Sequence, residues 1–165
     1  MTEPNLADCL EWGKGSDPVL IHLRAFLPLR VTPTDPPSLS VRIQSGIIQI
    51  VGGADKVIAT QTLDLSSYIP ADPDYARWVL VSVNDAGTVV ATAGTAVTPT
   101  TALVSGGSPA NLPTTPENTV RRSALVQMFR TAGNLPMPSI NENPRAGYTD
   151  IVDVRMWDLM PGQLA

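Results

Sequence analysis

The chain has little of what most enzymes use for chemistry. Its 165 residues include one cysteine and one histidine, and aromatic residues make up only 5%. The single cysteine, Cys9, excludes a disulfide within the chain and a metal cage built from several of its own thiolates. His22 would have to serve any Ser-His-Asp or Cys-His arrangement. We therefore expect no enzyme and no catalytic, cofactor or metal site, with Cys9 as a small buried residue and His22 on a strand surface.

Positive charge is scarce as well. The 11 lysines and arginines are outnumbered by 15 acidic residues, which gives a net charge of −4 and a pI near 4.8. Arg121, Arg122 and Arg130 form the one local basic cluster, whereas nucleic-acid binding needs a basic stripe or patch. No apolar run approaches the roughly 20 residues that span a bilayer. We expect neither a nucleic-acid partner nor a membrane span.

Two carboxylate pairs are the remaining candidates for chemistry. Asp72 and Asp74 could bind calcium, but the other oxygen ligands and the glycine of a calcium loop are missing, so turn-forming aspartates are favoured. Asp150 and Asp153 could supply the two carboxyl groups of a glycosidase, although no supporting motif surrounds them. The glycine-rich stretches 52–55 and 105–108 lack the features of a phosphate loop.

The sequence is instead rich in strand patterns. Apolar residues alternate with polar ones over 39–43, and a Ser-Gly turn at 45–46 leads into 47–51. A second turn at 52–55 leads into 56–65, where apolar residues alternate again. Runs of this kind joined by short turns are typical of successive antiparallel strands.

The clearest pattern is a hairpin over 77–93. Two β-rich runs flank the turn Asn-Asp-Ala-Gly, which predicts a type I turn with a G1 bulge: Asn84 bonds within the turn and Gly87 adopts the left-handed conformation. Apolar residues occupy both faces of the first strand, so both faces should be buried. The residues expected in a subunit interface or the core are Trp78, Val79, Leu80, Val81, Val83 and Val89.

Residues 1–37 are predicted to form an arm ahead of the sheet. A short helix is expected around residues 6–12, followed by a strand over 19–31 whose odd positions are all apolar. Pro28 places part of that strand at an edge or bulge, and the prolines of 32–37 should interrupt pairing. The candidate attachment residues of this arm are Leu6, Leu10, Trp12, Ile21, Leu23, Leu27 and Leu29.

The second half of the chain is less regular. Residues 95–118 consist mainly of Thr, Ser, Gly and Pro, which predicts a long loop that is exposed or crosses to another subunit. The segment 118–130 fits a helix or a strand, and we prefer a strand. Residues 151–157 should form the last strand and 158–165 a tail. Residues 38–157 are thus predicted to form one all-β domain, an antiparallel β-sandwich or jelly-roll.

Residues 68–97 resemble a module of structural proteins from tailed bacteriophages. The resemblance lies in a strand of the form Arg-Trp-Val-Leu-Val, a turn, a second strand and a terminal Gly-Thr. A Pro-rich segment follows, then strands near 123–129 and 149–155. It implies a β-sandwich virion protein, assembled in the host cytoplasm, that forms a homotrimer in a head fibre or spike, decoration protein or tail appendage. The N-terminal arm would dock onto a capsid or tail protein.

We therefore expect a non-enzymatic structural protein in which faces such as Val79, Val81 and Val83 pack between subunits. A carbohydrate- or receptor-binding β-sandwich module is the alternative, because aromatic side chains can stack on sugars. Its candidate platforms are Trp12, Trp78, Trp157, Tyr68, Tyr75 and Tyr148. For Trp78, which lies on an apolar strand, a core position is the better interpretation.

Overall fold

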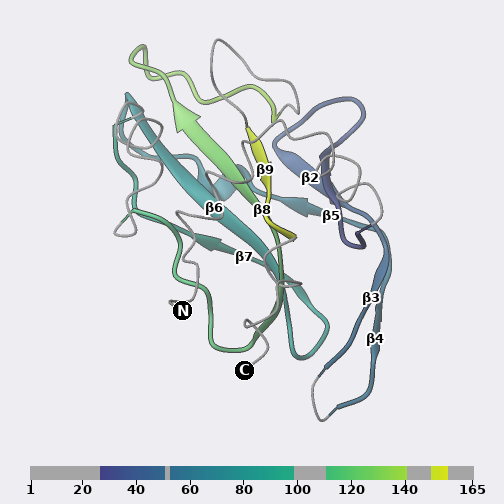
Figure 1. The fold of residues 1–165 in the computed structure, drawn as a ribbon. Coiled ribbons are helices and arrows are strands. Elements are labelled where there is room, and N and C mark those ends of the chain that lie inside the picture. The colour runs from purple at the N-terminus through teal and green to yellow at the C-terminus, as the bar shows by residue number, and fades with distance from the viewer. Residues whose placement is uncertain (1–26, 51–52, 99–110, 141–149, 156–165) are drawn as a thin grey trace, which may run out of the picture.

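The computed structural model describes residues 27–50, 53–98, 111–140 and 150–155. These residues form an all-β, antiparallel structure, as predicted. Figure 1 shows the longest strands at its centre. The elements are β1 (Val31–Pro33), β2 (Ser40–Ile43), β3 (Gly46–Ile48), β4 (Lys56–Ile58), β5 (Gln61–Asp64), the 3₁₀ turn η1 (Ser66–Tyr68), β6 (Tyr75–Asn84), β7 (Val89–Ala93), β8 (Thr119–Arg130) and β9 (Ile151–Asp153).

The hairpin of β6 and β7 is confirmed. Val83 pairs with Val89 beside the turn, and the Asn84 Oδ1 accepts a hydrogen bond from the Thr88 N–H at 2.9 Å. Gly87 has a φ of 80° and donates its N–H to the Asn84 carbonyl at 2.9 Å. Because an L-residue with a side chain rarely adopts that φ, Gly87 fits the predicted turn.

The ambiguous segment 118–130 is a strand. Its β8 pairs with β6 over almost the whole length of both strands, and β9 pairs with the other edge of β8. The resulting four-stranded sheet has the order β7-β6-β8-β9. Residues that the sequence separates by a long loop therefore become direct neighbours in one sheet.

A second sheet, of order β1-β2-β5, leads into the hairpin of β3 and β4. The predicted strand 56–65 is divided, because pairing stops at Ala59 and Thr60. The Thr60 hydroxyl there accepts a hydrogen bond from the Ser45 N–H at 3.1 Å. The β3–β4 hairpin then extends beyond the other strands as a narrow ribbon (Figure 1).

The expected strand over 19–31 is wrong in its described part. Residues 27–30 form no strand, since Leu29 has a φ of 62°, and pairing begins at Val31. The pairing then continues through Pro33, where prolines were expected to interrupt it. Proline is tolerated there because β1 is an edge strand of its sheet. Residues 19–26 lie outside the described residues.

Two apolar clusters cover the two faces of the four-stranded sheet. On one face Val79, Val81 and Val83 pack in a cluster with residues of β1 to β4. On the other, Trp78 and Leu80 pack with Leu112, Leu125, Val152 and Val154. Of the two positions predicted for these residues, a subunit interface or the core, the structure shows the core, because the chain itself buries Val79, Val81 and Val83. The first cluster joins strands of different sheets, while the sandwich arrangement stays a prediction.

The long connection after β7 is only partly as predicted. Its described ends, 95–98 and 111–118, contain no strand, but Leu112 is 6% exposed and belongs to the core. Val97 continues beside β6 through a bridge to Ala76. The prediction that this segment is exposed is therefore wrong for Leu112, because its side chain packs with Trp78 and Leu80. Residues 99–110 lie outside the described residues.

We predict that Gly94→Ala destabilises the protein. A Cβ at Gly94 would lie 2.4 Å from the Asn111 carbonyl oxygen and 2.9 Å from the Pro113 nitrogen, both of which are backbone atoms. The backbone must therefore shift, at an expected loss of about 1–3 kcal/mol in unfolding free energy. Urea denaturation checks this, with Gly133→Ala as control, because its nearest contact is a side-chain atom at 3.9 Å. Equal stability of the two variants would contradict the close approach.

No helix within the described ranges has the length and apolar character that a membrane crossing requires.

Candidate functional site

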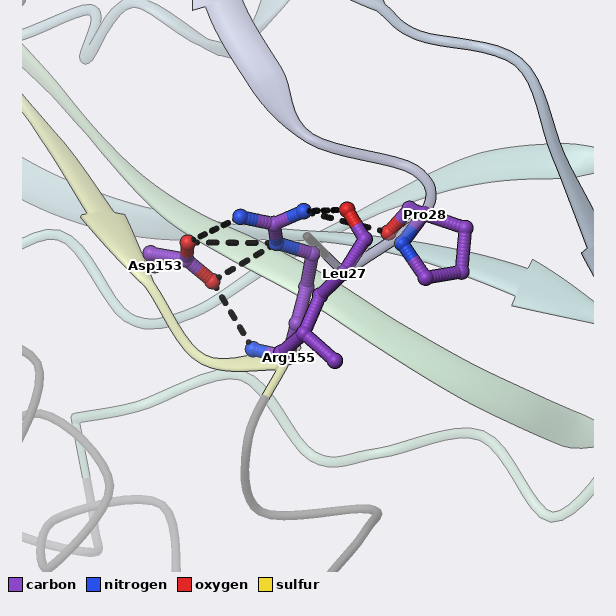
Figure 2. A network of polar contacts seen from close by, with 4 residues as sticks. All are labelled: Leu27, Pro28, Asp153 and Arg155. Atoms are coloured by element: carbon purple, nitrogen blue, oxygen red, sulfur yellow. Dashed lines mark hydrogen bonds and ion pairs between the residues drawn. The ribbon is translucent and has the colours of Figure 1, made fainter. Parts of the chain in front are cut away.

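The best-defined polar site among the described residues is a network around Arg155, which we call the arm root (Leu27, Pro28, Asp153 and Arg155). Arg155 is 2% exposed and forms an ion pair with Asp153 at 2.6 Å. Its Nη1 donates to the Leu27 carbonyl oxygen and to the Pro28 carbonyl oxygen, the latter at 3.2 Å. Figure 2 shows the guanidinium between the carboxylate and these two carbonyls. Arg155 thereby connects the end of β9 to residues 27 and 28.

The local sequence explains how Arg155 is oriented. Asp153 ends β9, and its carboxylate accepts from both the backbone N–H and the Nε of Arg155, each at 3.0 Å to Oδ1. Nε lies 3.1 Å and Nη2 2.6 Å from the second carboxylate oxygen, so the contact is forked. Planar, bidentate contacts of this kind fix a guanidinium more precisely than a single bond does. The remaining nitrogen is thus directed at the chain before β1.

This arrangement holds residues that are far apart in the sequence. A buried guanidinium is costly unless it is paired and hydrogen-bonded, and carbonyl oxygens complete the pairing here. Residues 27–30, which we call the lead-in to β1, are also fixed by the buried side chain of Leu29 and by the β1–β2 pairing. Chemically the arm root binds peptide carbonyls, so its effect is to fasten one segment of chain to another.

The candidate attachment residues lie in different parts of the structure or outside the described residues. Leu29 is fully buried in the core, so its assignment to an attachment surface is wrong. Leu27 is half-buried at the arm root. Residues 31–33 of the predicted arm pair with β2 as the strand β1, so this part of the arm belongs to the sheet. The other candidates, Leu6, Leu10, Trp12, Ile21 and Leu23, lie outside the described residues.

The aromatic candidates are not brought together by the described residues. Trp78 is 2% exposed in the core, as its apolar strand indicated. Tyr68 is half-buried and donates its hydroxyl to the Ala91 carbonyl at 3.1 Å. Tyr75 is exposed on β6. Trp12, Tyr148 and Trp157 lie outside the described residues, so Tyr75 is the one described aromatic candidate that offers an exposed ring.

The carboxylate candidates lie in different surroundings. Asp153 is engaged by Arg155, while Asp150 is fully buried and its carbonyl accepts the Gln127 N–H at 2.7 Å. Asp72 and Asp74 lie exposed before β6, and Asp74 has a φ of 59°, which suits the predicted turn. Among the described residues, no three His, Cys, Asp or Glu side chains gather as they would around a metal ion. Cys9 and His22 lie outside them.

Sequence reasoning missed the arm root. The alternation of Asp153 and Arg155 about one residue was a usable signal, because alternate residues of a strand share a face. The carbonyls of Leu27 and Pro28 gave no signal, since every residue carries a carbonyl and only the fold selects these two.

Comparison with known proteins does not add to this picture: no family model, no curated protein and no solved structure matches the chain.

Proposed function

We propose that this protein is a non-enzymatic structural component of a tailed-bacteriophage particle. In this proposal it assembles with copies of itself, as a homotrimer, and attaches to a capsid or tail protein through its N-terminal residues. The particle would be assembled in the host cytoplasm.

The segments that carry the resemblance support this proposal, because they are neighbours in the fold. The hairpin of β6 and β7, the strand β8 and the strand β9 correspond to the three parts of the resemblance, and they form one sheet. The β6 side chains of this sheet pack on both of its faces. The resemblance therefore covers strands that form one sheet.

The observation that carries the proposal is the arm root. A segment that holds a subunit on a particle must transmit force into a folded body without pulling the first strand away. Arg155, Leu29 and the β1–β2 pairing fasten the chain directly after residue 26. The chain is therefore held firmly from residue 27 onward, where an attachment arm would have to join the body.

Removal of residues 1–26 is expected to abolish attachment while the body still folds. We expect mass spectrometry of purified particles to detect the full chain and to lose the shortened chain by at least tenfold. A chain in which residues 1–26 are replaced by a Gly/Ser sequence of equal length controls for chain length and should be lost to the same extent. Undiminished incorporation of the shortened chain would contradict attachment through the arm.

Assembly with copies of itself has a separate test. Multi-angle light scattering of the full chain is expected to give three times the 17.5 kDa subunit mass. A monomer across the micromolar range would contradict the homotrimer.

A further inference from the structure

β7 is an edge strand of the four-stranded sheet (Figure 1). Within the described ranges it pairs with β6 and with no other strand. An edge strand presents a row of N–H and C=O groups on which the strand of another chain can build. The outer side of β7 is therefore a place where two copies of this chain could join, unless something closes it.

The hydrogen-bond pattern shows which backbone groups of β7 face outward. The Gly94 N–H donates to the Trp78 carbonyl at 2.8 Å, and the Asn84 N–H donates to the Thr88 carbonyl at 3.0 Å. In an antiparallel pair, hydrogen-bonded and non-hydrogen-bonded positions alternate. The N–H and C=O groups that point away from β6 are therefore those of Val89, Ala91 and Ala93.

Tyr68 occupies the middle of this outer side. Its hydroxyl donates to the Ala91 carbonyl at 3.1 Å, which is where the N–H of an added strand would have to lie. Beyond the end of β7, the Thr95 N–H donates to the Asn111 carbonyl at 3.1 Å. The outward groups on either side of Ala91 are thus separated by an occupied position. A strand cannot be added to β7 without displacing Tyr68, because a ladder needs consecutive pairs.

The turn after β5 holds Tyr68 in this position. The Ser66 N–H and hydroxyl both donate to the Asp64 carboxylate, each at 2.9 Å. The Tyr68 N–H donates to the carbonyl of Leu65, whose side chain is fully buried. The Tyr68 ring is half-buried and packs against the cluster that contains Val79. Tyr68 thus crosses from the end of β5 to the edge of β7 as a fixed part of the body.

We propose that Tyr68 is an edge guard, which keeps a second copy of this chain from adding a strand to β7. A second copy is the partner excluded, because an edge that is open in one subunit is open in every subunit, and two such edges can pair about a two-fold axis. The inference does not rest on the proposed function. It goes beyond that function, because it directs assembly away from the β7 edge whatever the number of subunits.

Sedimentation velocity of Tyr68→Ala tests the guard. The concentration that places half of the protein in species larger than those of wild type should fall at least tenfold, because the ring and the hydroxyl both leave the β7 edge. Adding Ala91→Pro should reverse this association, since proline has no N–H to offer and an edge strand tolerates it. Tyr75→Ala is the matched control and should associate as wild type does, because Tyr75 is exposed on β6.

Tyr68→Phe decides the question if Tyr68→Ala shows no cooperative unfolding by circular dichroism. It keeps the ring in the apolar cluster and removes only the donor to Ala91, so it should associate more strongly than wild type. Wild-type association of the deciding variant would overturn the proposal. Association that persists after Ala91→Pro would also overturn it, because the chains would then join elsewhere.

The two proposals fail in different ways. The mass of the wild-type protein tests the homotrimer, whereas the difference between each variant and wild type tests the guard. A wild-type monomer would contradict the homotrimer and leave the comparison of variants intact.

Discussion

Removal of residues 1–37 is expected to unfold the protein, whereas removal of residues 1–26 leaves it folded. The longer deletion takes away β1, with its ladder to β2, and the side chains of Leu29 and Val31, which are 0% and 6% exposed. Loss of a buried leucine side chain alone costs about 2–5 kcal/mol, and a buried valine adds about 1.5–3 kcal/mol. Typical domains have only about 5–15 kcal/mol of stability. The longer deletion therefore removes much or all of it.

Circular dichroism and urea denaturation of the two shortened chains provide the measurement. The chain beginning at Leu27 should show a cooperative transition and the chain beginning at Ser38 should show none. The full chain is the reference for both. Two shortened chains with the same denaturation midpoint would show that β1 and Leu29 contribute nothing to stability, against their place in the core.

The same residues explain why the sequence predicts an arm that runs to residue 37 and so includes β1. The prolines of 32–37 correctly indicate a region poor in regular pairing, but an edge strand tolerates a proline on its open side. Whether a strand lies at an edge depends on the order of strands in the sheet, which local sequence does not encode. The position of Leu29 was harder still to predict, because its left-handed φ breaks the strand while its apolar side chain continues the alternation.

The hairpin of β6 and β7 shows the opposite case. Its turn chemistry, its β-branched strands and its two apolar faces all point to the same structure, and agreement between such local signals is what makes a prediction reliable. What covers each face was beyond the sequence. One face of β6 meets strands from the first third of the chain and the other meets Leu112, contacts that depend on long-range topology.

The candidate site could likewise be predicted only where its residues are close in sequence. Asp153 and Arg155 are close in sequence, and their pairing could have been expected from strand alternation. The contact with Leu27 and Pro28 joins residues more than 120 positions apart, as the separations of 128 and 127 show. Backbone carbonyls recognised in this way have no sequence signature.

Arg155→Met is expected to be among the most damaging single substitutions in the described residues. The methionine fills much of the buried volume but removes the ion pair with Asp153 and the donors to two carbonyls. Breaking one side of a buried pair costs about 3–5 kcal/mol. We expect the lower part of that range, because the Asp153 side chain is 22% exposed and water recovers part of the loss. Arg155→Lys should lose less, since it keeps the charge without the fork.

Urea denaturation of Arg155→Met, Asp153→Asn and the double variant separates the ion pair from the carbonyl contacts. If the pair acts as one unit, the double variant is less damaged than the sum of the single variants, by about 1–3 kcal/mol. Arg42→Met is the matched control, since Arg42 is exposed on β2 and its replacement should change stability by no more than about 0.5 kcal/mol. Trypsin adds a local readout: cleavage after Arg30 should accelerate in Arg155→Met, because the lead-in to β1 is released before the whole body unfolds. A variant that loses global stability without faster cleavage there would show that Arg155 supports the core but does not hold the arm root.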